Sequence, residues 1–271
     1  MAPLFDEGAV AVVEWTVDAG WPPFEVPAWV ERLLAYYGGE RRLYAHGFGL
    51  SPLSGEWRPR QDAWLERLRA EVERRSYNHV SEHFCFSLAG DFEQAGPLPV
   101  PMTPSTVALG RARLERLAEI AGRPVGLENL ATSFGPKDAL DQGEFLDRLL
   151  EPVDGFVLLD VHNLYCQIEN FSLDPATLLA SYPLERVREI HVSGGSWYPT
   201  SVDPNGPPMR RDTHDAAVPE AVFALLELAL DRCPNVEAVF LERLPDSIVS
   251  EADVVQFQSD YRRVVAEVQS A

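Results

Sequence analysis

The stretch "VLLDVHNLYC", residues 157–166, puts polar side chains directly after an apolar run. Residues 157–159 are typical of a buried β-strand, whereas Asp160, His162 and Asn163 follow at once. In parallel α/β folds the segments that follow the strands build the active site. The stretch therefore predicts a buried parallel strand whose far end carries functional residues.

The same alternation of strand and helix patterns runs along most of the chain. Strand-like runs are "VAVVEW", "ERRLYAHGFGLS", "YNHVSEHFCFS", "RPVGLENL", "GFVLLDVHN", "RVREIHVSGG", a weak "MRRDTH" and "NVEAVFLERL". Between them lie amphipathic runs such as "PAWVERLLAYYG" and "RQDAWLERLRAEVERR", with apolar residues three and four apart. Eight strand candidates alternating with helices predict an α/β fold, a TIM-like (β/α)8 barrel forming one catalytic domain over residues 1–271. The Pro- and Gly-rich residues 194–210 predict a long loop in place of the helix after strand 6.

Composition excludes several classes of protein. The chain has 271 residues and a formal net charge of -19, which disfavours a nucleic-acid partner because such binding draws on Lys and Arg. No apolar run reaches the roughly 20 residues of a membrane span, and the N-terminus lacks the pattern of a signal peptide. We expect a cytoplasmic protein with no membrane partner. Cys85, Cys166 and Cys233 show no paired spacing and are expected to be buried apolar residues rather than disulfides or zinc ligands.

Candidate metal ligands lie at the downstream ends of the predicted strands. Because these ends meet at one face of a barrel, residues far apart in the chain should gather there. A lone histidine or glutamate at a strand end is usually an ordinary polar residue, but at least five of the six histidines occupy such positions. The candidates are His46, His83, Glu128, Asp160, His191, Asp212, His214 and Glu242.

Metal ions explain how so many carboxylates can be packed together. Without cations they would repel one another and lose hydration. Imidazole and carboxylate without thiolate suit Fe, Mn or Zn, and eight ligands exceed the needs of one tetrahedral zinc, so we expect two or three ions.

Three further residues are catalytic candidates. Strand parity predicts that His162 points the same way as Asp160, as an extra ligand, a proton shuttle, a group that supports a ligand or a substrate contact, while Asn163 faces the other way. Asn129 follows Glu128 and is expected to orient a ligand, although a direct role stays open. The chain has no GxSxG elbow, P-loop or dinucleotide-binding glycine fingerprint, which disfavours triad hydrolysis and nucleotide chemistry.

Eight short motifs in order resemble one known family, the multinuclear non-heme iron-dependent oxidative enzymes, which include the methanobactin-biosynthesis oxidase. They are "HGFGLS" at 46–51, "VSEH" at 80–83, "PLPVPMT" at 97–103, "LENL" at 127–130, "LLDVHN" at 158–163, "EIHVSG" at 189–194, "DTHD" at 212–215 and "LER" at 241–243.

The resemblance implies a xylose-isomerase-like barrel holding two or three iron ions, with O2 as co-substrate. The implied reaction is oxidation of a cysteine or C-terminal residue in a ribosomally made precursor peptide, often with a partner protein that recognises the leader peptide. The implied iron ligands coincide with the eight strand-end residues. The family usually has Asn at the position of His162, and many members carry a further histidine after the glycines at 194–195, which this chain lacks.

Two alternatives remain open from the sequence. A zinc- or manganese-dependent barrel hydrolase or sugar isomerase shares the pattern of strand-end His and carboxylate residues. A noncatalytic metal-binding or peptide-scaffolding protein is the second alternative.

Overall fold

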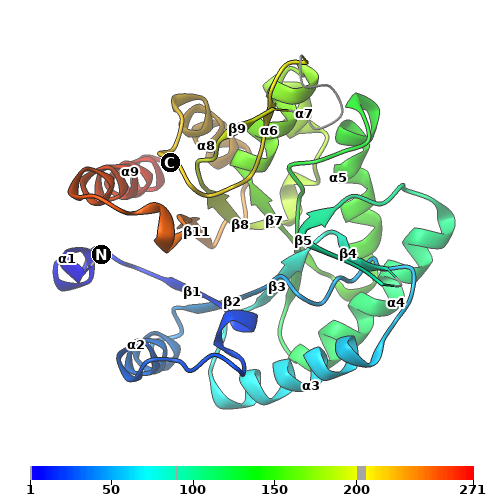
Figure 1. Ribbon diagram of the computed structural model, residues 1–271, viewed down its shortest axis with the longest axis horizontal. Helices are drawn as coiled ribbons and strands as arrows, with labels where there is room; N and C mark the ends of the chain where they lie inside the picture. The colour runs from blue at the N-terminus through cyan, green and yellow to red at the C-terminus, as the bar shows by residue number, and fades with distance from the viewer. Residues whose placement is uncertain (1, 90, 200–205) are drawn as a thin grey trace. The chain divides into compact units, whose positions relative to one another are not determined.

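Strands and helices alternate along the computed structural model, which describes residues 2–89, 91–199 and 206–271. Figure 1 shows this succession from the blue N-terminal elements to the red C-terminal helix. The strands are β1 (Val13–Thr16), β2 (Leu43–Gly47), β3 (Val80–His83), β4 (Phe86–Ala89), β5 (Phe92–Leu98), β6 (Val125–Glu128), β7 (Phe156–Asp160), β8 (Val187–Val192), β9 (Trp197–Tyr198), β10 (Met209–Arg210) and β11 (Ala238–Leu241).

Most helices begin where the sequence predicts them. They are α1 (Ala2–Asp6), α2 (Ala28–Gly39), α3 (Pro59–Arg74), α4 (Pro104–Ala121), α5 (Pro136–Leu150), α6 (Val161–Phe171), α7 (Pro175–Ala180), α8 (Glu220–Arg232) and α9 (Glu251–Ser270), with short 3-10 turns η1 (Val17–Gly20), η2 (Glu151–Val153), η3 (Leu184–Arg186) and η4 (Pro245–Ser247). At the start of α4 the Thr103 hydroxyl accepts a hydrogen bond from Thr106 N at 3.1 Å, and Pro104 occupies the first turn. Such caps satisfy amide groups that have no partner within the helix.

The chain divides into two units. One comprises residues Val10–Glu128 and Phe145–Val157, and the other Met1–Ala9, Asn129–Glu144 and Leu158–Ala271. The prediction of a single catalytic domain over residues 1–271 stays a prediction.

In the first of these units, four neighbouring strands run parallel. The registers pair β1 with β2, β2 with β3 and β3 with β6, and they set His46 beside Ser81 and His83 beside Glu128. Gly126 lets β6 pass close to the Phe156 ring, since a Cβ there would lie 2.3 Å from a ring carbon. His79, to which the sequence assigned no role, packs between the rings of Tyr44 and Phe156 as a core residue.

In the other unit, β8 and β11 are parallel and bring His191 opposite Phe240. The amide of Glu242, one residue beyond β11, donates to Val192 O at 2.9 Å, so the pairing continues to Glu242. Helices α6 and α8 pack against each other in this unit. The parallel pairing thus positions the segments that follow β8 and β11.

The main sheet has seven strands in the order β1-β2-β3-β6-β7-β8-β11 among the described residues. The α/β barrel class is confirmed, but the prediction that residues 209–214, the weak seventh run, form a strand of the barrel is wrong. Its residues Met209 and Arg210 pair antiparallel with Tyr198 and Trp197 instead, in a separate hairpin. Prolines at 207 and 208 directly before it leave only a two-residue strand, because proline cannot donate to a sheet.

The long segment after β8, the sixth predicted strand, lacks a helix in its described residues 193–199 and 206–219, as the sequence predicts. The rest of the predicted loop, residues 200–205, lies outside the described residues. The sequence missed the β4–β5 hairpin, because it read residues 77–87 as one strand. Within the described chain no helix combines the length and the apolar character needed to cross a bilayer.

Candidate metal centre

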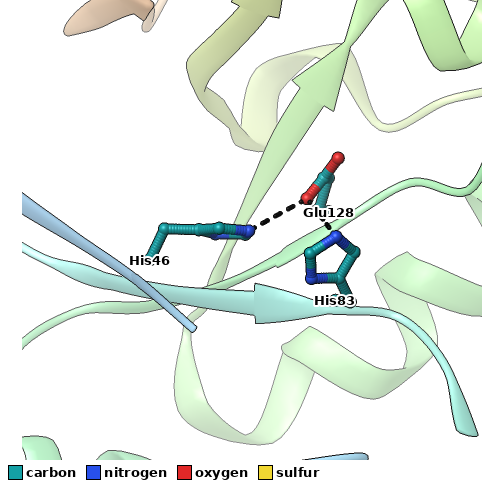
Figure 2. Close-up of side chains that lie close together, drawn as sticks. All are labelled: His46, His83 and Glu128. Atoms are coloured by element: carbon teal, nitrogen blue, oxygen red, sulfur yellow. Dashed lines mark ion pairs between the residues drawn. The ribbon is translucent and has the colours of Figure 1, made fainter. Parts of the chain in front are cut away.

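Three residues from adjacent strands form a cluster that we call the first centre: His46, His83 and Glu128. Both histidine Nε2 atoms lie 3.2 Å from the same carboxylate oxygen, Glu128 Oε2. Figure 2 shows the two rings directed toward this carboxylate. All three residues stand at the downstream ends of parallel strands, so the register of the sheet explains their proximity.

Hydrogen bonds on the far side of each ring fix which nitrogen carries the proton. His83 Nδ1 lies 3.2 Å from Gly47 O, which can only accept, so Nδ1 donates. His46 Nδ1 lies 2.8 Å from Ser81 Oγ, and that hydroxyl donates to Ala45 O at 3.3 Å, so it accepts from His46. In the neutral rings both Nε2 lone pairs therefore face Glu128. This is the arrangement of a metal site, in which outer hydrogen bonds orient histidine ligands.

A buried carboxyl group, Glu82, supports the first centre from behind. It accepts from His83 N at 3.1 Å and from Leu50 N at 3.4 Å. Burial, followed by the nearby charge of Asp18, raises the pKa of Glu82 well above its usual range. Asp18 in turn accepts from Gly49 N at 2.9 Å and Trp64 Nε1 at 2.5 Å, which fixes the glycine-rich segment after His46.

A second cluster, which we call the second centre, consists of Asp160, Asp212 and His214, whose possible ligand atoms lie within 4.8 Å of one another. His214 Nε2 is 2.8 Å from Asp212 Oδ1. Asp160 ends β7, whereas the other two follow β10. His214 has a positive φ of 51°, an uncommon backbone conformation for this residue type that often marks functional positions.

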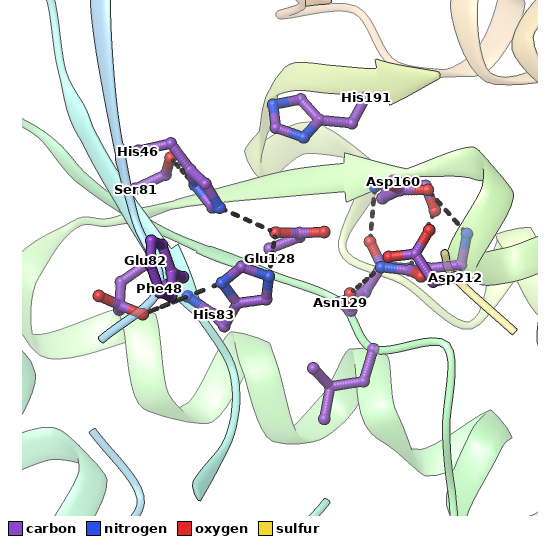
Figure 3. A network of polar contacts seen from close by, with 12 residues as sticks. His46, Phe48, Ser81, Glu82, His83, Glu128, Asn129, Asp160, His191 and Asp212 are labelled. Atoms are coloured by element: carbon purple, nitrogen blue, oxygen red, sulfur yellow. Dashed lines mark hydrogen bonds and ion pairs between the residues drawn. The ribbon is translucent and has the colours of Figure 1, made fainter. Parts of the chain in front are cut away.

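Asp160 is held by a network of amide groups. One of its carboxylate oxygens accepts from Asn163 N at 2.7 Å and so caps α6. Asn129 accepts from Asp160 N at 2.7 Å and donates to Asp160 O at 3.1 Å, while Asn163 Nδ2 donates to Asn129 O at 2.8 Å. Figure 3 shows Asn129 against Asp160. These contacts fit the orienting role expected of Asn129, which stays a prediction, and they place the catalytic candidate Asn163 in the same network.

The parity argument for His162 is wrong, because α6 begins at Val161 and the strand ends at Asp160. His162 nevertheless reaches the second centre: its Nδ1 lies 3.0 Å from Asp212 Oδ1. Its Nε2 faces the Cys166 thiol at 4.0 Å and Arg210 NH2 at 3.5 Å. Burial raises the pKa of Cys166 well above its usual range, so the thiol keeps its proton. Both nitrogens of this buried ring therefore have partners other than a metal.

His191 and Glu242 form a pair in the same unit. His191 Nδ1 is 3.0 Å from Glu242 Oε2, which lies 3.8 Å from His214 Nε2. The sequence missed Glu189, whose buried carboxylate lies 3.5 Å from His191 Nε2. Its signal was present, since residues two apart on a strand share a face.

The charges of the second centre support one another. Burial would raise the pKa of Asp212, but the His214 charge and hydrogen bonds from His162 and His214 outweigh it, so this pKa lies below its usual range. Burial likewise opposes the charge of His214, but Asp212 and Glu242 raise its pKa well above the usual range. In the absence of a metal, the Asp212 carboxylate is therefore ionised and the protonated His214 ring serves as its counter-ion.

Each of the eight predicted ligands thus has a possible ligand atom within 4.8 Å of one on another predicted ligand. His46, His83 and Glu128 do so in one unit, and Asp160, His191, Asp212, His214 and Glu242 in the other. Their role as ligands stays a prediction.

Solved structures confirm the fold class. The chain is similar to a xylose isomerase-like TIM barrel protein from Mycobacterium smegmatis in complex with magnesium, with a TM-score of 0.53, 15% identity and coverage of 97% of this chain and 86% of that one. It is also similar to an L-ribulose 3-epimerase (TM-score 0.60, 13% identity, 99% and 88% covered). A third match is endonuclease IV from Thermus thermophilus (TM-score 0.57, 17% identity, 100% and 94% covered).

Sequence relatives point to a narrower group. A protein of Caulobacter vibrioides named UPF0276 is 32% identical over 200 residues, covering 71% of this chain and 68% of that protein. One from Acinetobacter baylyi is 29% identical over 212 residues, covering 78% and 70%. The model of a family described as RiPP precursor modification enzyme MbnB/TglH/ChrH, where RiPP denotes a ribosomally made and modified peptide, matches residues 25–261. With its TIM-barrel fold and this match over most of its length, the chain belongs to the MbnB/TglH/ChrH family of RiPP precursor modification enzymes.

Proposed function

We propose that this protein is an iron-dependent oxidoreductase that uses O2 to oxidise a cysteine or the C-terminal residue of a ribosomally made precursor peptide. The observation that carries the proposal is the first centre, where two histidines and one carboxylate converge on one point. Two histidines with one carboxylate are the ligand set of many non-heme iron enzymes that use O2. Family membership supports the peptide substrate.

The residues present fit iron. His46, His83 and Glu128 would hold one ion, and Asp160, Asp212 and His214, with His191 and Glu242 beside them, would hold another or two. The set contains imidazole and carboxylate groups but no thiolate among its members, a donor set suited to iron, manganese or zinc. When bound, iron supplies the one-electron steps that let O2 accept electrons from the peptide.

The chain's own side chains orient the ligands and exclude water. Ser81 and Gly47 hold the two histidines of the first centre in one tautomer. Asn129 and Asn163 hold Asp160. His162 donates through Nδ1 to Asp212 and so holds that carboxylate in place. The burial of Glu128, Asp160 and His191 keeps bulk water from these groups.

We further propose that the protein acts in the cytoplasm with a partner that recognises the leader of the precursor peptide. Members of this family modify precursor peptides, which implies such a peptide as the substrate here.

The test is co-expression with any short peptide found to be encoded beside this gene, in iron-supplemented cells, followed by mass spectrometry of the peptide. We expect a mass change with the wild-type protein in air and none in an anaerobic assay with the purified iron-loaded protein. Glu128→Ala should abolish the change, whereas Glu115→Ala, which removes an exposed carboxylate on α4, should leave it intact.

Other outcomes favour the alternatives. A protein that purifies with zinc or manganese after iron supplementation, and whose activity does not depend on O2, would be a hydrolase or isomerase. An unchanged peptide output with Glu128→Ala would point to a noncatalytic metal-binding or scaffolding protein.

A further inference from the structure

Arg210 is a buried cation beside the second centre. It is 6% exposed and lies in the two-residue strand β10, two residues before Asp212. Its backbone is fixed from both sides by Asn170, which accepts from Arg210 N at 2.8 Å and donates to Arg210 O at 2.9 Å. These two hydrogen bonds fix the backbone from which the buried Arg210 side chain extends.

Two aromatic rings lie close to the guanidinium. Its central carbon lies 5.3 Å from the centre of the Tyr165 ring and 5.7 Å from that of Trp197. Along the edge, NH2 faces Nε2 of His162 at 3.5 Å. His162 in turn donates through Nδ1 to Asp212, so the guanidinium is separated from the second centre by one imidazole ring.

No carboxylate of the described residues forms an ion pair with Arg210, and its Nε finds no hydrogen-bond partner among them. The other arginine that is buried among the described residues, Arg75, does have acidic partners: it pairs with Glu31 at 2.6 Å and with Glu71. Burying an unpaired charge is costly, and a guanidinium presents parallel N–H donors that match a carboxylate. Carboxylates are abundant in a chain with a net charge of -19, so a buried arginine that pairs with none of the described ones is unusual.

We propose that Arg210 binds a carboxylate of the peptide substrate and so positions the peptide beside the second centre. This inference rests on the proposed function, in which the substrate is a peptide. The carboxylate pairs with Nε, which has no hydrogen-bond partner among the described residues. Trp197, one of the two aromatic residues beside the guanidinium, is 45% exposed, so a rotation of its side chain would open a path from solvent to Arg210. The carboxylate is either the C-terminus or an acidic side chain.

The test measures binding of small probes to the metal-loaded protein without O2, by calorimetry or NMR titration. The probes are N-acetylglycine, with a free C-terminal carboxylate, N-acetyl-aspartate amide, with only a side-chain carboxylate, and N-acetylglycinamide, with neither. We expect one of the two acids to bind at least about tenfold more tightly than the neutral amide, as for a charge-assisted bidentate pair. The acid that wins identifies the source of the carboxylate.

Two variants separate Arg210 from the metal and from general charge. Arg210→Gln should abolish the preference for the acid. Arg211→Gln removes the same charge from the next residue, an exposed arginine whose guanidinium lies 4.9 Å from the Tyr198 ring, and should keep the preference. Arg210→Lys keeps the charge without the planar fork and should reduce the preference, which provides a folded alternative if the glutamine variant does not fold.

Equal binding of acids and amide by the wild-type protein overturns the inference, as does a preference that survives in both Arg210 variants, because the metal would then hold the carboxylate. Neither result bears on O2-dependent oxidation. Conversely, a peptide that is never oxidised would overturn the proposed function while the dependence of acid binding on Arg210 still stands.

Discussion

The first centre is built from three neighbouring strands, whereas the second takes its residues from the end of a strand and from a segment beyond a hairpin. His46, His83 and Glu128 are set side by side by the register of parallel strands. Asp212 and His214 lie outside the parallel strands, and the side chains of His162 and Ser193 contact Asp212 instead. Strand register therefore sets the residues of the first centre side by side, whereas the second centre depends on side-chain contacts to Asp212 and on a backbone hydrogen bond from Leu244 N to His214 O.

The supporting residues differ in the same way. In the first centre, one outer partner is the backbone carbonyl oxygen of Gly47, a group that every residue type carries. In the second, Asp212 accepts from His162 and from Ser193, both side chains. The second centre should consequently be the easier one to alter by mutation and the more variable in its chemistry.

The largest effect is expected for Glu128→Ala. Because both histidines of the first centre face one Glu128 oxygen, its loss should lower metal affinity there by more than the roughly 100-fold typical of outer-sphere mutations. Elemental analysis of the purified variant should show loss of metal from the first centre, with the second retained. Glu115→Ala is the control. If the variant keeps the full metal content, the first centre is not a metal site.

Asp212→Asn tests the second centre in the same way. The substitution keeps the shape but removes the charge that faces His162 and His214, so we expect metal affinity at the second centre to fall by about 100-fold. Metal content at the first centre should not change. Simultaneous loss of metal from both centres in either variant would show that they do not bind independently.

Ser81→Ala probes the outer partner of His46. Loss of the hydroxyl that accepts from His46 Nδ1 should weaken metal binding at the first centre by about tenfold. Titration of the metal-free protein with ferrous iron measures this directly. An unchanged affinity would mean that the strand alone orients the ring.

Gly195→Ala tests how closely the hairpin segment approaches the second centre. A Cβ at this position would lie 2.3 Å from Arg211 O and 2.8 Å from His162 Cε1, so the segment must shift. We expect destabilisation by about 1–3 kcal/mol, the usual cost of overpacking. Thermal unfolding measures it, with Gly55→Ala as the control because a Cβ added at Gly55 would meet no atom within 4 Å. Equal melting temperatures for the two variants would contradict the close approach.

The smallest effect concerns the cysteine near each centre. Burial, followed by the charges of nearby carboxylates, raises the pKa of Cys85 and of Cys166 well above the usual range. Burial, followed by the charge of Glu185, raises the pKa of Cys233 to about 12. Since each unit of pKa above the pH lowers the thiolate population tenfold, iodoacetamide should leave all three thiols of the native protein nearly unmodified at pH 8. The rate should increase as the pH rises. Rapid labelling of Cys166 that metal binding prevents would identify a thiolate ligand and contradict a sulfur-free second centre.

Most of the fold follows from local patterns in the sequence. The capped, amphipathic helices and the buried strands lie close to where periodicity predicts them, because a 3.6-residue or 2-residue repeat is a local property. The exceptions are the hairpins. Residues 209–210 look like a weak barrel strand, yet they pair with β9, since strand partners are chosen by contacts distant in the sequence.

Local sequence was enough to name the candidates at the downstream ends of parallel strands, because such residues lie at the same end of their strands as their neighbours, whereas Asp212 and His214 were named from a parallel strand that does not form. How these residues meet depended on the folded chain. Folding placed His162 on a helix rather than a strand, because the Asp160 carboxylate caps that helix, and it buried Arg210 beside His162, which no local pattern reveals. Strand direction is encoded residue by residue, whereas the environment of a side chain is set by segments that fold against it from elsewhere in the chain.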